Sequence, residues 1–290
     1  MAILTPTYNR SKELRRLFET LREQTCPNFE WYIVDDGSTD NTADLVADFK
    51  SVAPFRIFYL RKDNGGKHTA INLAMQYVDC ELTFIVDSDD WLPPTSIQSI
   101  LDAFRRIPDA KGVCGISFLK EMHNADVMCR FPANWMRGRY MDVRINRRIQ
   151  GDKAEVFYTN CLREYPFPVF EGERFYHEDG VWARMSVRYE MYYVNEVVYE
   201  GEYLQGGLTS SNRTIKMSSP RGMKDRSEAF LEYPGFVNSS ILLKHALLWD
   251  IYSYGNASNR EGCPRPFMCR LLNPIAWVIR KKWLRESGAK

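Results

Sequence analysis

The sequence predicts an α/β protein in which a mainly parallel β-sheet is flanked by helices and followed by a helical C-terminal extension. Over residues 1–120, short apolar runs alternate with segments whose apolar residues recur at helical spacing, as in a parallel sheet covered on both faces. Polar clusters follow three of the apolar runs, at the strand ends where such sheets bind ligands. From residue 221 onward the pattern is helical.

Five strands are expected in the first part of the chain, because each is a short apolar run bounded by turn-forming residues. They cover residues 2–5, 30–34, 56–60, 82–86 and 113–119. Ser11 is expected to cap the first helix, and Asp40 or Asn41 the second. The inward faces of the four intervening helices are expected at Leu14, Leu17, Phe18 and Leu21; Leu45, Val46 and Phe49; Ile71, Ala74, Met75 and Val78; and Ile97, Ile100, Leu101 and Phe104.

The rest of the chain is less regular. Residues 121–175 contain few periodic runs, whereas residues 190–204 are rich in Tyr and Val and predict strands. Two helices are expected around residues 227–233 and 237–254. We therefore divide the chain into a domain over residues 1–215, with halves 1–110 and 111–215, and a helical extension over residues 216–290.

Composition excludes several classes of protein. The 290 residues carry 39 Lys and Arg against 37 Asp and Glu, a net charge of +2, so nothing in the charge balance favours nucleic-acid binding. Hydrophobic residues make up 44%, enough for a core and against disorder. Seven cysteines without a CxxC pair, and no signal-peptide pattern after Met1, predict a reduced, cytoplasmic location.

Three carboxylates follow the fourth expected strand, in the segment Asp87-Ser88-Asp89-Asp90. One Asp would be ordinary in a turn, but three acids at one strand end repel one another. A divalent cation relieves that repulsion, and carboxylate oxygens suit Mg²⁺ or Mn²⁺, ions that also bind substrate phosphates. The pattern therefore favours a metal–phosphate site over a purely structural turn.

Two further clusters are ambiguous when taken alone. Asp35-Asp36 follow the second strand, where they could form an Asx-turn and helix cap or accept hydrogen bonds from a ribose hydroxyl or a base N–H. Asn64-Gly65-Gly66-Lys67-His68 could be a tight turn with a solvated lysine, or a loop that lets the backbone and Lys67 approach a phosphate at a helix start. The loop is not a Walker A motif, because Arg61 and His68 stand where that motif needs Gly and Ser or Thr.

The segment His177-Glu178-Asp179 is followed by Val181, Met185 and Val187, which predict a helix that starts here. Acidic residues favour a helix N-terminus, so the two acids could serve the helix alone. They could also supply a general base. An HExxH motif is absent, which excludes the usual zinc-protease pattern.

In order and spacing these segments resemble family 2 glycosyltransferases of the bacterial capsule and exopolysaccharide type, which have the Rossmann-like GT-A fold. The resemblance covers residues 1–210 and is most specific in the first 105; Gly201 to Ser210 resembles a loop of the bacterial members, whereas residues 120–170 match no pattern of the family. It assigns residues 1–110 to the nucleotide sugar and residues 111–215 to the acceptor. Its motifs are Pro6-Thr7-Tyr8-Asn9-Arg10, Asp35-Asp36-Gly37-Ser38-Thr39-Asp40, Asn64-Gly65-Gly66 and Asp87-Ser88-Asp89-Asp90.

The resemblance implies roles for these residues. Asp87 and Asp89 form the DxD motif, which holds Mn²⁺ or Mg²⁺ on the donor diphosphate, and Glu178-Asp179 supplies the base, with Asp179 the first choice. The activity implied is transfer from a nucleotide sugar, expected to be a UDP-sugar, to a hydroxyl of a glycan or polyprenyl-linked acceptor in cell-surface polysaccharide synthesis. The nucleotide is expected to contact Thr5, Pro6, Thr7, Tyr8, Asn9, Arg10, Asp35, Asp36, Asn64, Gly66, Lys67, Asp87 and Ser88.

The residue types suit this chemistry. A metal stabilises the charge that grows on a departing nucleoside diphosphate, and a carboxylate can take the proton of the attacking hydroxyl. One base opposite the leaving group gives direct displacement with inversion.

Three other functions share some of these features. A sugar-phosphate nucleotidyltransferase has a similar sheet, but Pro6-Thr7-Tyr8 replaces its Gly-rich opening loop with Arg. A haloacid-dehalogenase-like phosphatase also places Asp-x-Asp after a strand, but Trp91 stands where that class has Thr or Val. A non-catalytic carbohydrate-binding protein would not need carboxylates in all three clusters.

The C-terminal tail combines apolar and basic residues. Asn273 is expected to cap a helix with Pro274 at its first position, and the helix continues with Trp277, Trp283 and several cations. It is too short to span a membrane, but its composition suits a headgroup boundary. The sequence therefore predicts peripheral contact of residues 273–290 with the inner face of the plasma membrane, the alternative being that the apolar residues pack on the body.

Overall fold

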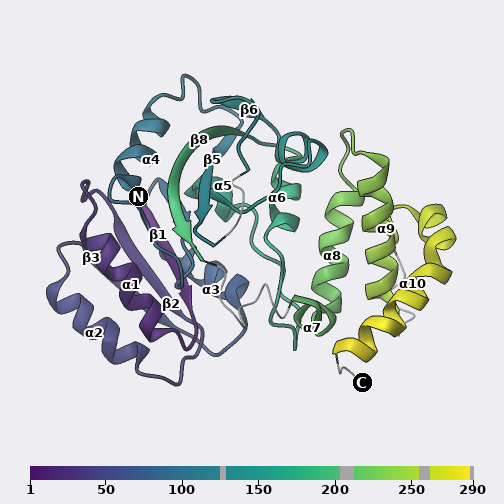
Figure 1. Ribbon diagram of the computed structural model, residues 1–290, viewed down its shortest axis with the longest axis horizontal. Helices are drawn as coiled ribbons and strands as arrows, with labels where there is room; N and C mark the ends of the chain where they lie inside the picture. Colours follow the sequence, from purple (N-terminus) through teal and green to yellow (C-terminus); the bar gives the residue numbers. More distant parts are fainter. Residues whose placement is uncertain (125–128, 203–211, 255–261, 288–290) are drawn as a thin grey trace. The chain divides into compact units, whose positions relative to one another are not determined.

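The computed structural model describes residues 1–124, 129–202, 212–254 and 262–287 (Figure 1). The chain forms two compact units. Unit 1 comprises Met1–Gly138, Ile149–Pro166 and Tyr189–Tyr203, and unit 2 comprises Arg139–Arg148, Phe167–Arg188 and Leu204–Lys290. The units alternate along the chain, and the boundary expected at residues 215/216 stays a prediction. Of the expected loop from Gly201 to Ser210, residues 203–210 lie outside the described part.

Unit 1 is built on one mixed sheet of eight strands in the order β3-β2-β1-β4-β7-β5-β8-β6. Strands β1, β2, β3 and β4 run parallel, as do β5 and β8, whereas β7 is antiparallel to both its neighbours and β6 is antiparallel to β8. The predicted α/β class with a largely parallel sheet is confirmed. The strands are β1 (Ala2–Thr7), β2 (Glu30–Asp35), β3 (Arg56–Arg61), β4 (Leu82–Ile85), β5 (Val113–Met122), β6 (Met136–Gly138), β7 (Lys153–Tyr158) and β8 (Glu190–Gly201).

Helices cover both faces of this sheet. Side chains alternate between the two faces along β1 and β2, and their packing partners show which helices lie on each face. Ile3 and Trp31 share a buried cluster with residues of α1 (Ser11–Arg22), α2 (Thr42–Val52) and α4 (Ser96–Arg105). The next residues along the same strands, Ala2 and Tyr32, pack instead with Val78, just after α3 (Lys67–Ala74). Because successive side chains of a strand point to opposite faces, α3 lies on the face away from the other three helices. A short helix, α5 (Thr159–Arg163), follows β7.

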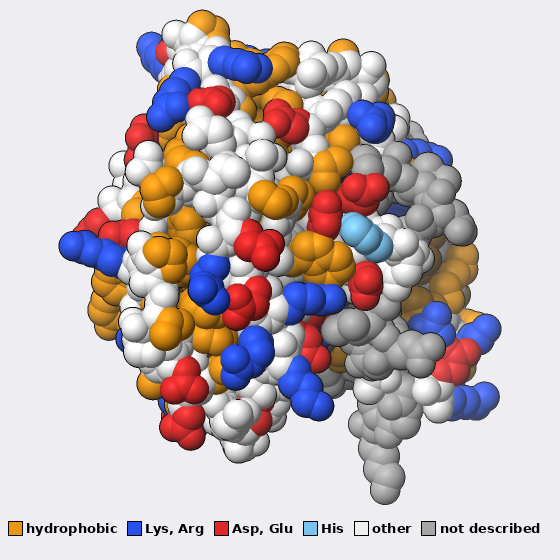
Figure 2. Space-filling model, turned by 60° about the vertical axis from the view of Figure 1, so that its left-hand side comes forward, with side chains coloured by type: hydrophobic (Ala, Val, Ile, Leu, Met, Phe, Trp, Pro, Cys, Tyr) orange, Lys and Arg blue, Asp and Glu red, His pale blue; other side chains and the backbone are white. Residues whose placement is uncertain are grey.

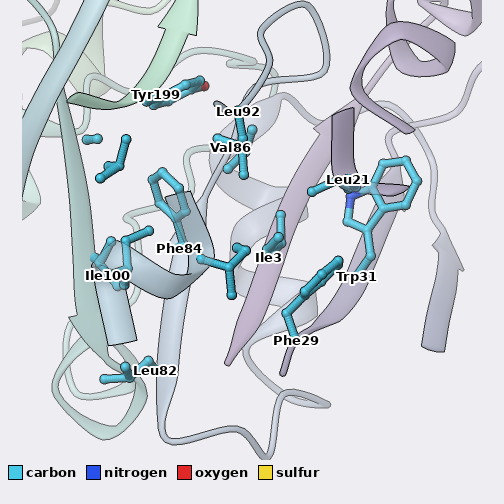
Figure 3. Close-up of a cluster of buried hydrophobic side chains, with 14 of the residues drawn as sticks. Ile3, Leu21, Phe29, Trp31, Leu82, Phe84, Val86, Leu92, Ile100 and Tyr199 are labelled. Atoms are coloured by element: carbon cyan, nitrogen blue, oxygen red, sulfur yellow. The ribbon is translucent and has the colours of Figure 1, made fainter. Parts of the chain in front are cut away.

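The largest apolar core lies on the α1–α2–α4 face of the sheet (Figure 3). Phe18 and Phe49 stack with their ring centroids 4.0 Å apart, and Trp31 lies close to both. Every residue expected on the inward faces of α1 and α2 is buried. This core holds the carboxyl ends of β1, β2 and β4 in fixed register, and these ends carry the polar clusters.

Unit 2 is helical. It contains the π-helix η1 (Met141–Asn146), α6 (Asp179–Met185), α7 (Asn212–Met217), α8 (Pro220–Leu231), α9 (Ser239–Ser253) and α10 (Pro266–Ser287). Its core joins η1, α6, α8 and α9 through residues such as Met141, Ala183 and Phe230. Cys269 and Ala276 of α10 are buried, and Cys269 packs with Trp249 of α9.

Two expected helix starts are wrong. Ser11 does not cap α1: it is the first helical residue, and its backbone N–H donates to the carboxylate of Asp40 from the next loop at 3.2 Å. Asn273 does not cap the last helix, because α10 begins at Pro266 and continues through Pro274. The Asn273 side chain instead accepts the Tyr254 hydroxyl at 2.6 Å.

None of the helices in the described ranges is both long and apolar enough to cross a membrane.

Candidate functional site

The parallel strands bring the three polar clusters to one edge of the sheet in unit 1. Thr7 at the end of β1 pairs with Asp35 at the end of β2, and the Asp36 N–H donates to the Thr7 carbonyl at 2.9 Å. On the other side of β1, the Val86 N–H donates to the Leu4 carbonyl at 2.9 Å. The segment from Asp87 to Asp90 therefore starts next to the first cluster, as the sequence predicts.

Asn9 connects the first loop, residues 7–10 at the end of β1, to the second loop, residues 35–40 at the end of β2. Its backbone adopts the left-handed conformation (φ 51°), and its N–H donates to the Ser38 hydroxyl at 2.9 Å. Its side-chain oxygen accepts from the N–H groups of Thr39 at 2.7 Å and Asp40 at 3.3 Å. Asn9 thus sets the position of both loops.

The side chains of the first loop point in different directions. Thr5 is buried, and its hydroxyl accepts the Trp31 indole N–H at 2.9 Å, so it serves the core. Pro6 lies within β1 beside Val34. The buried Thr7 hydroxyl has no hydrogen-bond partner among the described residues, and Tyr8 is 46% exposed. In this loop Thr7 therefore offers a hydroxyl without a partner among the described residues, and Tyr8 offers an exposed ring.

Asp35 is committed to internal hydrogen bonds. Its carboxylate accepts the Ser38 N–H at 2.7 Å and the Tyr59 hydroxyl at 2.5 Å, and the residue is 1% exposed. Burial and the bond to Asp35 raise the pKa of Tyr59, which keeps that hydroxyl a donor. Of the two roles left open by the sequence, a turn or a contact to a nucleoside, the hydrogen bond from Ser38 to Asp35 matches the turn.

Asp36 organises the glycine loop. Its two oxygens accept the N–H groups of Gly65 at 2.9 Å and Gly66 at 2.7 Å, and Lys62 completes the set at 2.8 Å. Gly66 has φ of 95°, a conformation that side-chain-bearing residues rarely adopt. Asn64 in the same loop is half-buried. Asp36 therefore places the start of α3, and Lys67 with it.

Asp87 and Asp89, the two acids of the predicted DxD motif, are each paired with a cation. Lys67 Nζ lies 2.5 Å from Asp87 Oδ1, and Arg10 forms an ion pair with Asp89. Burial alone would raise the pKa of Asp87, but the charges of Lys67 and Lys120 hold it below its ordinary value. The Asp87 and Asp89 side chains remain 36% and 21% exposed, whereas Ser88 between them is buried.

Asp90, the third acid of the segment, has a structural role. Its carboxylate accepts Lys120 Nζ at 2.7 Å and the Tyr199 hydroxyl at 2.8 Å, and it is 4% exposed. Burial raises the pKa of Asp90 to about 6, although Lys120 acts in the opposite direction. Tyr199 also accepts the Asp87 N–H at 2.7 Å, so it links both acids to β8. Nothing in the sequence singled out Lys120 or Tyr199, which lie on distant strands.

Asp87 and Asp89 fit a divalent cation. Both are accessible, both are oxygen donors, and positive charge already lies against each of them. Two carboxylates leave further coordination positions to phosphate oxygens and water, the usual arrangement for Mg²⁺.

A second group with metal-ligand chemistry lies at the ends of β5 and β8. One possible ligand atom from each of Glu121, His123 and Glu200 falls within 4.8 Å of the others. His123 Nε2 is 3.1 Å from Glu200 Oε2, which also accepts the Trp91 indole N–H at 2.7 Å.

Acidic and basic side chains alternate across one face of the molecule rather than forming a patch of one sign (Figure 2).

In unit 2, Asp179 is held by an arginine that the sequence did not single out. Arg226 of α8 donates from Nε to Asp179 Oδ1 and from Nη2 to Oδ2, both at 2.5 Å. His177 Nδ1 lies 2.9 Å from Asp179 Oδ1. Burial alone would raise the pKa of Asp179, but Arg226 and then His177 hold it well below its ordinary value. Glu178 precedes α6 and is half-buried.

Comparisons with known proteins agree on one family. Residues 2–164 match glycosyl transferase family 2. Chondroitin synthase from Escherichia coli is 35% identical over 108 residues, which are 37% of this chain and 15% of the synthase. The chain also spans only 17% of the Staphylococcus aureus poly(ribitol-phosphate) β-N-acetylglucosaminyltransferase TarS, at 32% identity.

Solved structures show the same fold. S. aureus TarS 1–349 in complex with UDP-GlcNAc has a TM-score of 0.64 at 18% identity, covering 93% of this chain and 78% of TarS 1–349. The mannosyltransferase PcManGT from Pyrobaculum calidifontis, in complex with GDP-Man and Mn²⁺, has a TM-score of 0.61 at 17% identity, covering 99% and 82%. The family match covers residues 2–164, more than half of the chain, and includes the three polar clusters at the edge of the sheet. The chain therefore belongs to glycosyl transferase family 2 and has the GT-A fold.

Proposed function

We propose that this protein is an inverting, metal-dependent glycosyltransferase that moves a sugar from a nucleotide sugar to a hydroxyl of a glycan or lipid-linked acceptor in cell-surface polysaccharide synthesis. The main support is the pair Asp87 and Asp89, two accessible carboxylates at the carboxyl end of the sheet with cations against them. The TarS and PcManGT structures hold UDP-GlcNAc and GDP-Man, which supports a nucleotide-sugar donor here.

The nucleotide would occupy the edge formed by the three loops. Thr7 offers a buried hydroxyl without a partner among the described residues, and Tyr8 offers an exposed ring for a base or sugar. Asn9, Asp35 and Asp36 hold the loops around it through the contacts given above. A UDP-sugar is the donor we propose, with Lys67 and Arg10 as the cations nearest its phosphates.

Mn²⁺ or Mg²⁺ would be held by Asp87 and Asp89, and it would supply positive charge against the leaving diphosphate. PcManGT, with Mn²⁺ in its complex, supports this assignment. With a metal or phosphate bound, Lys67 and Arg10 would exchange the carboxylates of Asp87 and Asp89 for phosphate oxygens. The charge of the donor then remains compensated throughout transfer.

Transfer needs one proton acceptor and one displacement. We assign the base to the segment Glu178-Asp179, which places two carboxylates at the start of α6, and a single displacement gives inversion. Because a single displacement forms no covalent sugar–enzyme intermediate, the mechanism needs no second carboxylate as a nucleophile.

The test is UDP binding to wild type and Asp89→Ala by calorimetry, with and without Mn²⁺. In Mn²⁺ the variant should bind UDP at least tenfold more weakly, a difference of about 1.4 kcal/mol, and the two proteins should agree without metal. Asp48→Ala, at an exposed position of α2, is the matched control and should behave as wild type. Equal affinity of wild type and Asp89→Ala in Mn²⁺ contradicts the assignment.

The same samples separate the alternatives. A glycosyltransferase releases UDP from UDP-sugars in Mn²⁺, a phosphatase releases inorganic phosphate, and a carbohydrate-binding protein releases neither.

We also propose peripheral contact with the cytoplasmic face of the plasma membrane through α10. The exposed side of this helix carries Phe267 (77% exposed), Leu271 (65%), Ile275 (52%) and Val278 (58%), which recur at helical spacing. α10 starts at Pro266, seven residues before the predicted tail of residues 273–290, so the stripe also includes Phe267 and Leu271.

Cations flank this stripe at Arg270, Lys281, Lys282 and Arg285, and each contributes about 1 kcal/mol near an anionic surface. Arg280 does not belong to them, since it donates to the Ile251 carbonyl. Ile275→Asp with Val278→Asp should abolish co-sedimentation with phosphatidylglycerol vesicles at low salt, whereas neutral vesicles should bind neither protein. Wild type that stays in the supernatant contradicts the proposal.

A further inference from the structure

We propose that the carboxyl end of β8, residues 199–201, positions Asp87 and Asp89 for the divalent cation, with the Tyr199 hydroxyl as the central contact. The inference rests on the proposed metal-dependent transfer and assigns positioning residues to it. These residues hold the chain that carries the two acids. All the contacts that support the inference lie within unit 1.

The Tyr199 hydroxyl forms hydrogen bonds in two directions. It accepts the backbone N–H of Asp87 at 2.7 Å and donates to Asp90 Oδ2 at 2.8 Å. Because an N–H group can only donate, the hydroxyl hydrogen is left for the carboxylate. The ring is buried in the main core, edge-on to Phe84 at a centroid distance of 5.6 Å, so the hydroxyl has little freedom to move. Tyr199 therefore fixes the backbone at Asp87.

Asp90 attaches the same segment to β5 and β8. Its carboxylate also accepts Lys120 Nζ at 2.7 Å, and this ammonium group lies 4.4 Å from the centroid of the Tyr199 ring. A Cβ atom at Gly201 would lie 2.2 Å from Asp90 Oδ1, so the carboxylate packs directly on the backbone of β8. Glycine is the residue that allows such a close approach. An alanine at this position would have to displace Asp90 from its bonds to Lys120 and Tyr199.

Trp91, the next residue, pairs with β8 through its backbone and its side chain. Its N–H donates to the Glu200 carbonyl at 3.0 Å, and the Glu200 N–H donates back to the Trp91 carbonyl at 2.9 Å. The indole N–H donates to Glu200 Oε2 at 2.7 Å. Arg16 of α1 lies over the indole ring, 4.1 Å from its centroid, and donates to the Asp89 carbonyl. The backbone at Asp89 is thereby held as well.

These contacts fix the backbone of the two acids and leave their side chains accessible. The Asp87 and Asp89 side chains are 36% and 21% exposed, so both can turn towards a cation. Mg²⁺ demands near-ideal octahedral geometry, and a chain that can shift presents its carboxylates less well. Groups that orient metal ligands without binding the metal contribute about 10- to 100-fold to metal affinity. Residues 199–201 should therefore act on metal binding, although we assign no metal ligand among them.

The experiment measures the affinity for Mn²⁺ in saturating UDP, from the electron paramagnetic resonance signal of the free ion. Tyr199→Phe keeps the ring and removes the hydroxyl, whereas Gly201→Ala places a methyl group against Asp90. Each variant should bind Mn²⁺ about 10-fold more weakly than wild type, or weaker still. Tyr192→Phe is the matched control, because Tyr192 lies on the same strand and in the same core but contacts Trp135 and Arg137 instead. It should bind Mn²⁺ as wild type does.

Two further measurements separate positioning from a purely structural role. Calorimetry without metal should give Tyr199→Phe the UDP affinity of wild type, because the lost hydrogen bonds hold Asp87 and Asp90 rather than the loops joined by Asn9 and Asp36. Urea unfolding of the same samples shows that the variants are folded and reports any loss of stability. A Tyr199→Phe protein that is less stable but binds Mn²⁺ as tightly as wild type overturns the inference.

An equal loss of Mn²⁺ affinity in Tyr192→Phe also overturns it, since any change in β8 would then have the same effect. If Gly201→Ala does not fold, Tyr199→Phe decides alone. If wild type binds no Mn²⁺ in UDP, or binds UDP equally well with and without Mn²⁺, the proposed metal dependence fails and the inference falls with it. Failure in the variants alone leaves the proposed function standing, so the two failures are distinguishable.

Discussion

At the scale of single residues, the acids of the polar edge divide into two groups that look alike in the sequence. Asp35, Asp36 and Asp90 are buried and accept several internal hydrogen bonds, whereas Asp87 and Asp89 stay accessible. The sequence could place all five at strand ends, because strand ends follow from apolar runs. It could not separate the two groups, since the partners Tyr59, Lys62, Lys120 and Tyr199 come from other strands and loops.

Buried histidines lead to a prediction about pH and stability. His245 is 2% exposed and stacks on Phe230 with a centroid distance of 3.8 Å, and its Nδ1 has no hydrogen-bond partner within the described ranges. Burial, followed by the charge of Arg226, lowers its pKa to about 3. In the unfolded chain His245 therefore binds a proton near pH 6.5, whereas in the folded protein it stays neutral at that pH. The folded state loses stability as the pH falls below 6.5.

His245→Phe should remove this dependence and keep the stacking. From pH 6.5 to 5 the histidine costs the folded state about 2 kcal/mol, at 1.36 kcal/mol for each pH unit. Urea unfolding of wild type and variant at pH 7 and pH 5 measures the difference. His68, also buried with its pKa lowered to about 4, is present in both proteins and cancels. Parallel pH dependence in the two proteins would contradict the prediction.

At the scale of elements, the first four strands and helices were predictable because each carries its own periodicity. β6, β7 and α5 were missed. β7 inserts antiparallel between β4 and β5, and its sequence, with Lys153 and Glu155 among apolar residues, has no clear strand pattern. Its place depends on pairing with Leu82–Phe84 and with Gly115–Leu119, both distant in sequence.

Gly115 shows how closely β7 approaches β5. A Cβ atom at this position would lie 2.1 Å from the Val156 carbonyl oxygen, which is backbone and cannot turn aside. Gly115→Ala should therefore force the strands apart and lower the free energy of unfolding by about 3 kcal/mol.

Ser117→Ala on the same strand is the matched control. It loses only the 3.2 Å hydrogen bond to Glu155, which contributes about 1 kcal/mol. Urea denaturation of the three proteins checks both values, and a Gly115→Ala protein as stable as Ser117→Ala would contradict the described approach of β7.

At the scale of the whole molecule, hydrogen bonds and ion pairs connect all the loops of the polar edge, although these loops are far apart in the chain. Asn9 joins the first loop to the second, Asp36 joins the second to the glycine loop, and Lys67 joins that loop to Asp87. The sequence predicted that the clusters meet, through the rule for parallel strands. It could not predict these fastenings, nor the two interleaved units, because both depend on contacts between distant segments.

This connection predicts that a nucleotide protects all the loops together. In hydrogen-exchange measurements, UDP with Mn²⁺ should slow exchange in peptides that contain Asn9, Asp36, Gly66 and Asp87 at the same ligand concentration, because a ligand that binds only the folded edge stabilises each contact in it. At a UDP concentration of 100 times the Kd, the added protection corresponds to about 2.7 kcal/mol. Removing the metal with EDTA, or Asp89→Ala, should reduce the protection in every loop. Protection confined to one loop, with the others unchanged, would show that the loops act separately.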